Sequence, residues 1–379
     1  MNVAIVGTGY VADAYLKSLT RHPEMKLLGV FDKLPERAQA FAAFHHTRTY
    51  PSLQAVGDDR SVQMVINLTN PRDHYEVSKS MLLAGKHVYS EKPMAMNMDH
   101  ARELMALAQA KGLQFVSAPC TVLSETCQTL WREVRKETVG RVRVVYAELD
   151  DGHIYQDQYE KWVSSLGTPW PYKDEFEVGC TLEHAGYYVS WMLAWFGPAK
   201  SVTAFASVQV PDKMDRHPGE TLDLISADFS VACIQFHNGV VARLTCSICA
   251  PHNHQLRIYG DKGYLGTDEC WNYRAPVFSR KRIKLRSRFI YNPFKTKHPH
   301  PPLPYPAPAQ KVGHYDMDFF RGPAEVAAAL REGRPSALTP EFALHVNEIS
   351  IAIHEALNSK GHVELTTTFE PLQPMKWAV

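Results

Sequence analysis

A lysine stands where an apolar run ends, in the stretch VYSEKPMAM at residues 88–96. Lys92 lies between Glu91 and Pro93, after β-branched and aromatic residues that indicate a strand. Burial and nearby cations lower the pKa of a lysine amine from about 10.4 toward the range in which the amine can accept a proton. Lys92 is therefore a candidate for proton transfer, and a lysine solvated at a strand end is the alternative.

A second pair of candidates lies on an expected helix, GCTLEHAGYYVSWMLAWFGP at residues 179–198. Thr181 suits the N-cap of this helix, and a Gly-Pro pair ends it. His184 and Tyr188 are four residues apart, so their side chains share one face. The helix is apolar nearly all round and should be buried, so both polar groups require hydrogen-bond partners. A histidine satisfied within the core is the alternative to a functional one.

Glycines near the start of the chain predict a dinucleotide site. In VAIVGTGYVA, residues 3–12, Gly7, Gly9 and Ala12 have the spacing G-x-G-x-x-A between an expected strand and an expected helix. Gly7 permits a tight turn, Gly9 lets the backbone approach a pyrophosphate, and the helix N-terminus faces the phosphates. A glycine-rich turn without a ligand is the alternative. The expected cofactor-binding residues of this loop are Gly7, Thr8, Gly9, Tyr10 and Val11.

The end of the second expected strand bears on which dinucleotide binds. Asp32 follows Gly7 by 25 residues, where a carboxylate can accept hydrogen bonds from ribose hydroxyls. A 2′-phosphate would meet like charge there, so we expect NAD, with NADP less favoured. Lys33 is a neighbouring cation that favours the opposite choice.

Strands and helices alternate over the first 120 residues, which is typical of a parallel sheet with helices on both faces. In such sheets the residues that follow the strands line one ligand-binding crevice. The expected strands are 3–6, 26–32, 64–69 and 86–90, and the expected helices are 35–44, 71–85 and 99–112.

Beyond residue 120 the pattern changes to alternating strands joined by hairpin-like turns, which predicts a largely antiparallel sheet. A chain of 379 residues is also too long for one ordinary core. We therefore expect two domains, 1–120 and 121–379. A proline-rich segment at 298–310 should run extended. The expected strands of the second domain are 142–149, 200–210, 222–236, 239–248 and 255–260.

Together these motifs resemble the Gfo/Idh/MocA family of glucose–fructose oxidoreductases and inositol dehydrogenases. The resemblance covers most of the chain and is carried by VGTGYVA, AGKHVYSEKPMA and ALREGRPSALTPEFALHVNEISIAIHEAL. It implies an α/β fold in which an N-terminal Rossmann domain precedes a C-terminal α/β domain with an open, mostly antiparallel sheet. That second domain would serve substrate binding and oligomerisation, and a homodimer or homotetramer is expected.

The resemblance also implies roles for individual residues. Thr69, Asn70 and His74 match the family loop beside the cofactor, and Glu91 and Lys92 match the EKP motif, whose lysine contacts the substrate hydroxyl.

The family pattern L-x-D-x-G-x-[HY] aligns with residues 182–188. His184 stands where the family usually has a carboxylate, and Tyr188 takes the last position. We expect Lys92 and Tyr188 to act on the reacting hydroxyl and His184 to orient the substrate or relay a proton.

A loop rich in aromatic and acidic residues, 150–177, precedes this helix. Aromatic rings often line sugar sites, so this loop is a candidate for substrate contact. A surface loop with its own aromatic cluster is the alternative. The candidates are His153, Tyr159, Trp162 and Trp170.

Two other patterns are weaker. Cys246, Cys249, His252 and His254 have a metal-like spacing, but the two cysteines would point to opposite faces of a strand, so no metal is expected. The basic stretch 280–288 is either a charged edge that discourages aggregation or a cationic surface for an acidic substrate group or a partner subunit.

The composition, with 45% apolar and 21% charged residues, is typical of a soluble globular protein. The net charge of +1 gives no reason to expect nucleic acid or membrane binding. Seven scattered cysteines, and an expected strand from residue 2 that leaves no room for a secretory leader, favour a cytoplasmic protein.

We therefore expect an NAD(H)-dependent oxidoreductase that moves hydride between nicotinamide and a hydroxyl-bearing carbon of a sugar or cyclitol. Two alternatives remain open. One is an NAD-dependent glycosidase that oxidises its sugar, possibly an anionic one, only transiently. The other is a non-catalytic NAD-binding regulator.

Overall fold

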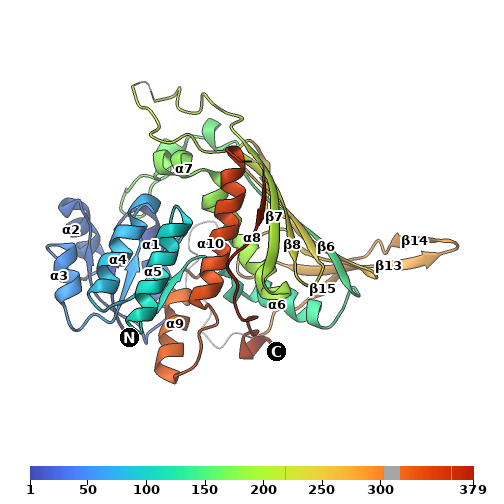
Figure 1. Cartoon of the computed structure of the whole chain (residues 1–379), viewed down its shortest axis with the longest axis horizontal. Helices are drawn as coiled ribbons and strands as arrows, with labels where there is room; N and C mark the ends of the chain where they lie inside the picture. The colour runs from blue at the N-terminus through green and yellow to red at the C-terminus, as the bar shows by residue number, and fades with distance from the viewer. Residues whose placement is uncertain (218, 303–315, 360) are drawn as a thin grey trace. The chain divides into compact units, whose positions relative to one another are not determined.

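The computed structural model describes residues 1–217, 219–302, 316–359 and 361–379. The chain forms two compact units (Figure 1). Unit 1 comprises Met1–Cys120, Gln158–Glu175 and Asp318–Ile351, and unit 2 comprises Thr121–Asp157, Phe176–Met317 and Ala352–Val379. The chain first leaves unit 1 after Cys120, and two later segments join that unit. The division into functional domains at residue 120 stays a prediction.

Unit 1 contains the expected parallel sheet, with five strands in the order β2-β1-β3-β4-β5. Its strands are β1 Asn2–Val6, β2 Lys26–Phe31, β3 Met64–Asn67, β4 His87–Ser90 and β5 Phe115–Ser117. Its first helices are α1 Tyr10–Leu19, α2 Pro35–Phe44, α3 Leu53–Asp58, the 3-10 turn η1 Pro71–Asp73, α4 His74–Leu83 and α5 Met98–Ala110.

Continuous apolar runs explain why these strands lie inside. Val3 to Val6 are all buried, as are Met64 to Asn67, and a strand covered on both faces has no polar side to present. The expected helix at 71–85 begins instead as the 3-10 turn η1, because Pro71 fixes the first position of that turn. Helix α9, Arg321–Glu332, and most of α10, Pro340–His354, also belong to unit 1.

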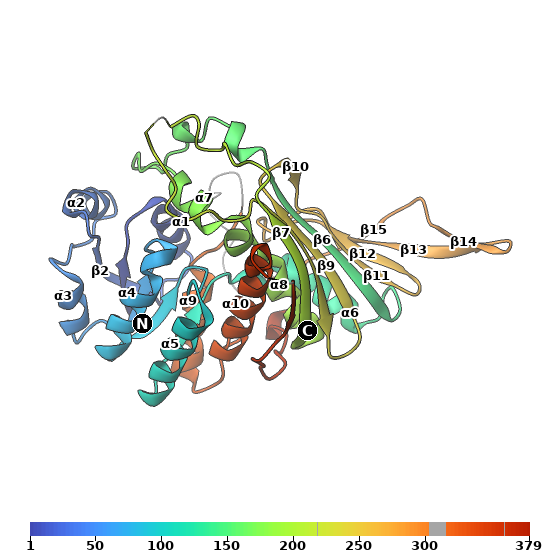
Figure 2. The same cartoon turned by 45° about the horizontal axis from the view of Figure 1, so that its top comes forward.

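Unit 2 contains the expected open sheet, with the main order β14-β13-β12-β11-β6-β9-β8-β7-β16. All pairs are antiparallel except β6 with β9. The longer strands lie side by side in Figures 1 and 2. They are β6 Val142–Gly152, β7 Ala199–Ser207, β8 Phe229–Phe236, β9 Val241–Ser247, β11 Leu256–Gly260, β12 Gly263–Thr267 and β13 Val277–Leu285; the shorter strands are β10 Ala250–Asn253, β14 Arg288–Tyr291, β15 Thr296–His298 and β16 His362–Glu364.

Helix α8, Cys180–Phe196, packs against β6, β8 and β9, and nearly all of its side chains are buried, as its composition predicts. Helix α6, Glu125–Arg135, packs against α8 and the strands β12 and β13. The expected strand at 222–236 is shorter than predicted, since β8 begins only at Phe229. The other helical segments are η2 Thr121–Leu123, η3 Ile154–Gln156, η4 Tyr159–Lys161, α7 Tyr172–Val178, η5 Glu355–Leu357 and η6 Lys376–Ala378.

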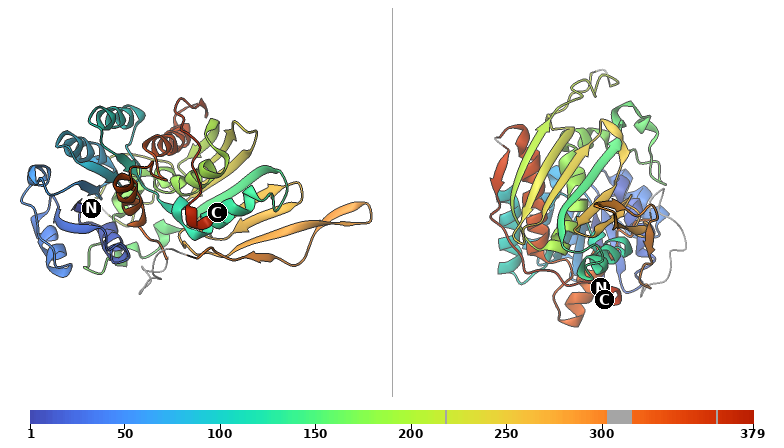
Figure 3. Two further views of the ribbon diagram at one scale, coloured as in Figure 1. Left: turned by 90° about the horizontal axis from the view of Figure 1, so that it is seen from below. Right: turned by 90° about the vertical axis from the view of Figure 1, so that its right-hand side faces the viewer.

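The basic stretch forms a hairpin rather than one strand. Strand β13 ends at Leu285, Arg286 turns the chain with φ +56°, and β14 returns from Arg288 opposite Leu285. A single strand would place Arg280, Arg282, Lys284, Arg286 and Arg288 on one face, but Arg286 lies in the turn and Arg288 pairs with Leu285, so these five side chains do not share a face. Figure 3 (left) shows the hairpin, in orange, reaching beyond the neighbouring strands of its sheet.

Of the proline-rich segment 298–310, residues 303–310 lie outside the described part of the chain. Among the described residues, no helix combines the length and apolarity needed to cross a bilayer.

Candidate functional site

The candidate residues of unit 1 follow four neighbouring strands at one edge of the parallel sheet. Phe31, Val6, Asn67 and Ser90 are the last paired residues of β2, β1, β3 and β4, and they lie in register with one another. Each strand is followed within two or three residues by candidates. These are Asp32 after β2, Gly7 to Gly9 after β1, Thr69 and Asn70 after β3, and Glu91 and Lys92 after β4. The carboxyl ends of parallel strands thus gather the predicted cofactor loop and the predicted lysine at one edge.

The glycine loop fits a dinucleotide. Gly7 has φ +94°, and an added Cβ would lie 2.5 Å from the carbonyl oxygen of Leu68, so only glycine suits this turn. A Cβ on Gly9 would meet no atom within 4 Å, which leaves room for a phosphate. Gly9 is also the N-cap of α1 and offers no capping side chain, so the first N–H groups of the helix can bind an anion.

Asp32 is held at the end of β2 by three hydrogen bonds. Its Oδ2 accepts from the backbone N and the Oγ1 of Thr8 at 2.8 and 2.9 Å, and its Oδ1 accepts from the backbone N of Leu34 at 2.9 Å. Asp32, the residue predicted to bind the ribose, is thereby fixed against the glycine loop. Lys33, which is 71% exposed, directs its amine to the carboxylate of Asp73 at 3.1 Å.

The backbone around Lys92 is anchored within unit 1. The buried carboxylate of Glu91 accepts from the hydroxyl of Tyr15 on α1 at 2.7 Å and from the backbone N of Lys92 at 3.0 Å. Burial and the negative charge of Glu91 raise the pKa of Tyr15, so the phenol stays a donor. The Lys92–Pro93 peptide is cis, and the Lys92 side chain is half-buried.

His74 joins the two neighbouring loops. Its Nδ1 lies 2.7 Å from the carbonyl oxygen of Pro93, and its Nε2 lies 2.9 Å from that of Thr69. The Thr69 hydroxyl donates to Asn67 at 2.6 Å, and Asn70 precedes the turn η1. These contacts place Thr69, Asn70 and His74 beside the Lys92 loop in the same unit.

In unit 2, His184 on α8 is paired with a carboxylate. Its Nδ1 lies 2.7 Å from Oδ2 of Asp151, which belongs to the end of β6, and both side chains are buried. Burial alone would raise the pKa of Asp151, but the charges and hydrogen bonds of His184 and His254 lower the pKa below its usual range. The carboxylate that the family has on this helix is therefore replaced by an imidazole that meets a carboxylate from a strand.

His254 continues this network. Its Nε2 donates to Oδ1 of Asp151 at 2.6 Å, and its Nδ1 donates to Oε1 of Glu269 at 2.9 Å. Burial disfavours the charged ring, but hydrogen bonds to Asp151, Cys270 and Glu269 raise the pKa of His254 to about 12. Trp271 packs edge-on against His254, with ring centroids 4.3 Å apart.

Tyr188 is fully buried, and its hydroxyl donates to the backbone oxygen of His254. Burial and nearby acidic groups raise its pKa well above the usual value. In this arrangement the phenol supports the His254 network, and its predicted action on a substrate hydroxyl stays a prediction.

The aromatic loop forms its own cluster in unit 1. Trp162 and Trp170 meet at 5.1 Å between ring centroids, and buried Tyr159 lies 5.9 Å from Trp170. The backbone N of Ser165 donates to Asp13 on α1 at 3.1 Å, which ties the loop to the nucleotide helix. His153 belongs to unit 2, where its ring packs against Tyr155. Contact of these residues with a substrate stays a prediction.

Three residues of these networks were missed from the sequence. Tyr15 lies three residues after Ala12 and so shares its inward face, a signal that could have been used. Asp151 lies two residues beyond the expected strand 142–149, beside a second acid, which is a weaker signal. Glu269 gave none, because its contact with His254 depends on strand register.

Comparison with known proteins identifies the class. A sequence profile for an oxidoreductase family with an NAD-binding Rossmann fold matches residues 1–118, and one for the GFO/IDH/MocA C-terminal domain matches residues 127–266. The chain therefore belongs to the Gfo/Idh/MocA oxidoreductase family, and it is an NAD(P)-dependent oxidoreductase.

Individual relatives act on different compounds. Trans-1,2-dihydrobenzene-1,2-diol dehydrogenase of Bos taurus is 26% identical over 276 residues, which cover 71% of this chain and 74% of the relative. A scyllo-inositol 2-dehydrogenase (NADP(+)) of Bacillus subtilis (strain 168) is 27% identical over 203 residues, covering 53% and 60%. The solved structure of levoglucosan dehydrogenase with NADH and L-sorbose has a TM-score of 0.76 at 17% identity, covering 97% and 99%, and shares the fold.

Proposed function

We propose that the protein is an NAD(H)-dependent oxidoreductase that interconverts a secondary alcohol and a ketone on a sugar or cyclitol, with Lys92 as the group that moves the hydroxyl proton. The position of Lys92 carries this proposal. It follows β4 at the sheet edge that also presents the glycine loop and Asp32. Oxidoreductase relatives named for inositol and for a dihydrodiol support a substrate with neighbouring hydroxyls.

The chemistry divides between cofactor and protein. A bound nicotinamide ring supplies the acceptor or donor of hydride. Lys92 in its neutral form accepts the hydroxyl proton during oxidation and returns it during reduction. Glu91 and His74 bind the backbone on either side of the Lys92 side chain, so the point from which this side chain extends is fixed.

NAD is the proposed cofactor. Asp32 is held beside the glycine loop, where its charge would oppose the 2′-phosphate of a bound NADP. The amine of Lys33 is directed toward Asp73, which reduces the cation's availability to a phosphate. A cytoplasmic location stays a prediction.

Kinetics of a Lys92→Met variant test the proposal. Purified protein is incubated with NAD or NADP and a panel of sugars, cyclitols and glycosides, and formation of reduced cofactor and release of aglycone are both recorded. We expect turnover with NAD, no aglycone release, and a loss of about 10²–10⁴-fold in kcat for Lys92→Met, since that is the usual contribution of a general acid–base. Binding of NAD should not change.

Lys26→Met is the matched control, because Lys26 is an exposed lysine at the start of β2, remote from the carboxyl ends of the strands. Its turnover should equal that of the unaltered protein. Equal turnover in Lys92→Met would refute the role of Lys92. Aglycone release without net reduced cofactor would replace the proposal with the glycosidase function, and NAD binding without hydride exchange on any substrate would favour a regulator.

A further inference from the structure

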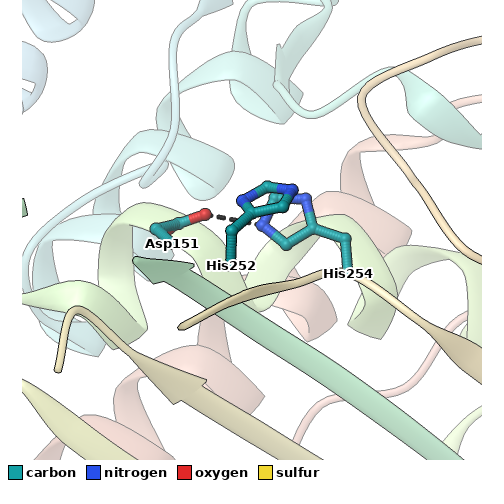
Figure 4. A group of neighbouring side chains, drawn as sticks. All are labelled: Asp151, His252 and His254. Atoms are coloured by element: carbon teal, nitrogen blue, oxygen red, sulfur yellow. Dashed lines mark hydrogen bonds and ion pairs between the residues drawn. The ribbon is translucent and has the colours of Figure 1, made fainter. Parts of the chain in front are cut away.

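We propose that Asp151, His252 and His254 form a binding site for a divalent metal ion of the zinc type. The three residues each offer one ligand atom, and these atoms lie within 4.8 Å of one another. Figure 4 shows the Asp151 carboxylate directed at the two imidazole rings. This set differs from the one considered in the sequence, since neither Cys246 nor Cys249 belongs to it.

Strand geometry brings the two histidines together. They are separated by one residue, so their side chains project from the same side of the extended chain, and their ring centroids lie 4.1 Å apart. Strand β10 pairs with the end of β6 through Ala250 with Gly152 and Asn253 with Asp150. Two residues of β10 therefore oppose the single residue Asp151, and such a bulge re-aims side chains toward a common point.

The spacing suits a small ion. A tetrahedral zinc ion with bonds of about 2.0–2.2 Å holds its ligand atoms roughly 3.4 Å apart. In the structure, Nε2 of His254 lies 2.6 Å from Oδ1 of Asp151, and the farthest pair of the set lies within 4.8 Å. The Asp151 and His254 atoms would have to move about 0.8 Å apart to reach that spacing, and the exposed His252 ring would supply the remaining adjustment.

The surroundings resemble those of a metal-bound histidine. Nδ1 of His254 donates to Glu269, which fixes the other nitrogen, Nε2, toward Asp151. Metal-ligating histidines almost always make such a hydrogen bond to a carboxylate or carbonyl. Glu269 is itself fixed by the backbone N–H groups of Cys270 and Trp271, both at 2.8 Å.

Two nitrogen ligands and one oxygen ligand define the class of metal. Imidazole suits zinc, copper, iron and nickel, whereas calcium and magnesium prefer sites made of oxygen. His252 is 45% exposed, so a bound ion would keep coordination positions open to water or a small anionic or hydroxyl ligand. Without an ion, a proton on His254 links the two carboxylates instead.

Titration with Co²⁺ and Zn²⁺ tests this site in the full chain. After treatment with a chelator, we expect one Co²⁺ per chain, a visible d–d spectrum without a thiolate charge-transfer band, and displacement by Zn²⁺. His252→Ala should weaken binding by roughly 100-fold or more, because it removes a ligand rather than a supporting group. Its exposed position makes loss of folding a poor explanation, and circular dichroism verifies the fold.

His237→Ala is the matched control, since His237 is an exposed histidine in a turn of the same unit. The affinity of His237→Ala for Co²⁺ should equal that of the unaltered protein. Asp151→Asn supplies a second variant that should also weaken binding. The proposal is overturned if the chain binds no cobalt, if His252→Ala binds as tightly as the unaltered protein, or if a thiolate band assigns the ion to Cys270. Binding is measured without substrate, so the outcome does not depend on the proposed function.

Discussion

Two lysines six residues apart, Lys86 and Lys92, differ in burial and in the role that we assign to each. Lys86 is buried, and its amine donates to the carbonyl oxygens of Asp59 and Val62 at 2.7 and 2.9 Å. Burial lowers its pKa, against the charges of Asp59 and Asp58. Lys86 therefore holds a loop of unit 1 together, whereas Lys92 lies half-buried beyond β4 at the edge that gathers the cofactor loop.

Replacing each lysine by methionine should separate the two roles. Lys86→Met leaves two carbonyl groups without their donor, so we expect a loss of about 1–3 kcal/mol in the free energy of unfolding. Urea denaturation followed by circular dichroism measures it. Lys92→Met should change that free energy by less than about 0.5 kcal/mol, as most partly exposed positions do. Equal stability of Lys86→Met and the unaltered protein would show that Lys86 does not hold the loop.

The pairing of His184 with Asp151 also belongs to the residue scale. The family carries a carboxylate at the helix position that His184 occupies here. In this chain the negative charge is carried by Asp151 of β6, whose carboxylate lies 2.7 Å from the imidazole of His184. A carboxylate that contacts a histidine fixes its orientation and tautomer. The histidine therefore keeps a carboxylate in contact with this helix position, although the carboxylate now belongs to another residue.

At the scale of elements, the first strand–loop–helix unit depends on two glycines for different reasons. Gly7→Ala would put a Cβ 2.5 Å from a backbone carbonyl at φ +94°, so we expect a loss of about 1–3 kcal/mol in the free energy of unfolding. Gly9→Ala meets no atom within 4 Å and should keep that free energy. It should instead weaken NAD binding about tenfold or more, because the methyl group takes the space of a phosphate.

Calorimetric titration of NAD and urea denaturation of both variants give the two readouts. An unchanged NAD affinity in Gly9→Ala would place the pyrophosphate elsewhere and remove the basis for reading this loop as the cofactor site.

A buried charge cluster fixes α9 to the nucleotide-binding part of unit 1. Asp318, just before α9, lies 3.0 Å from Nε2 of His22, 3.3 Å from Nε of Arg321 and 3.8 Å from Arg21. Burial alone would raise the pKa of Asp318, but the hydrogen bond to His22 and the charge of Arg321 lower it. A depressed carboxyl pKa stabilises the fold above the unfolded value of about 3.9, and this stabilisation is lost as pH falls through the folded value.

Asp318→Asn should therefore lower the free energy of unfolding by about 3–5 kcal/mol at neutral pH, because it leaves buried cations without their partner. The difference from the unaltered protein should begin to narrow as the pH falls below about 4, where the carboxyl of the unfolded chain takes up a proton, and should vanish only below the depressed pKa of the folded state. Urea denaturation at several pH values measures the difference. Asp99→Asn, at a carboxylate that is 98% exposed, should show no difference at any pH. If the difference in the free energy of unfolding between Asp318→Asn and the unaltered protein stayed constant with pH, the argument would be contradicted.

Sequence reasoning succeeded where local pattern decides structure. The β-branched runs and the glycine spacing predicted β1 to β4, and parallel geometry then implied that Asp32, Thr69 and Lys92 share an edge. It failed where distant strands set the contacts. The partners of His254 depend on the register of β10 against β6, which no local pattern encodes. The turn at Arg286 was missed because an arginine with positive φ carries no turn signal.

Charge is distributed unevenly over the whole molecule. Residues 280–297, which include most of β13 and all of β14, hold eight lysines and arginines and no acidic residue, a formal charge of +8. The whole chain carries +1, which leaves −7 for the other residues. Exposed apolar side chains accompany the cations. Ile283 faces Ile290 across the hairpin, and Phe289 lies beside Lys284. A two-stranded ribbon of this kind is marginally stable alone in water, so a covering surface is expected.

The predicted homo-oligomer would cover the hairpin, since the residues of a second copy outside its own hairpin carry a net charge of −7. We expect the chain to self-associate at low salt and the association to weaken as salt screens the charges.

Replacing Arg282 and Lys284 by glutamate puts two acids on one face of the hairpin and should weaken association by roughly tenfold or more, about 1.4 kcal/mol. Sedimentation equilibrium at low and high salt measures this constant. Replacing Lys200 and Lys26 by glutamate makes the same change in net charge at exposed residues that are not part of the hairpin and should have a smaller effect. A chain that is monomeric at every salt concentration, or a hairpin variant that associates as strongly as the control, would show that the hairpin serves another partner.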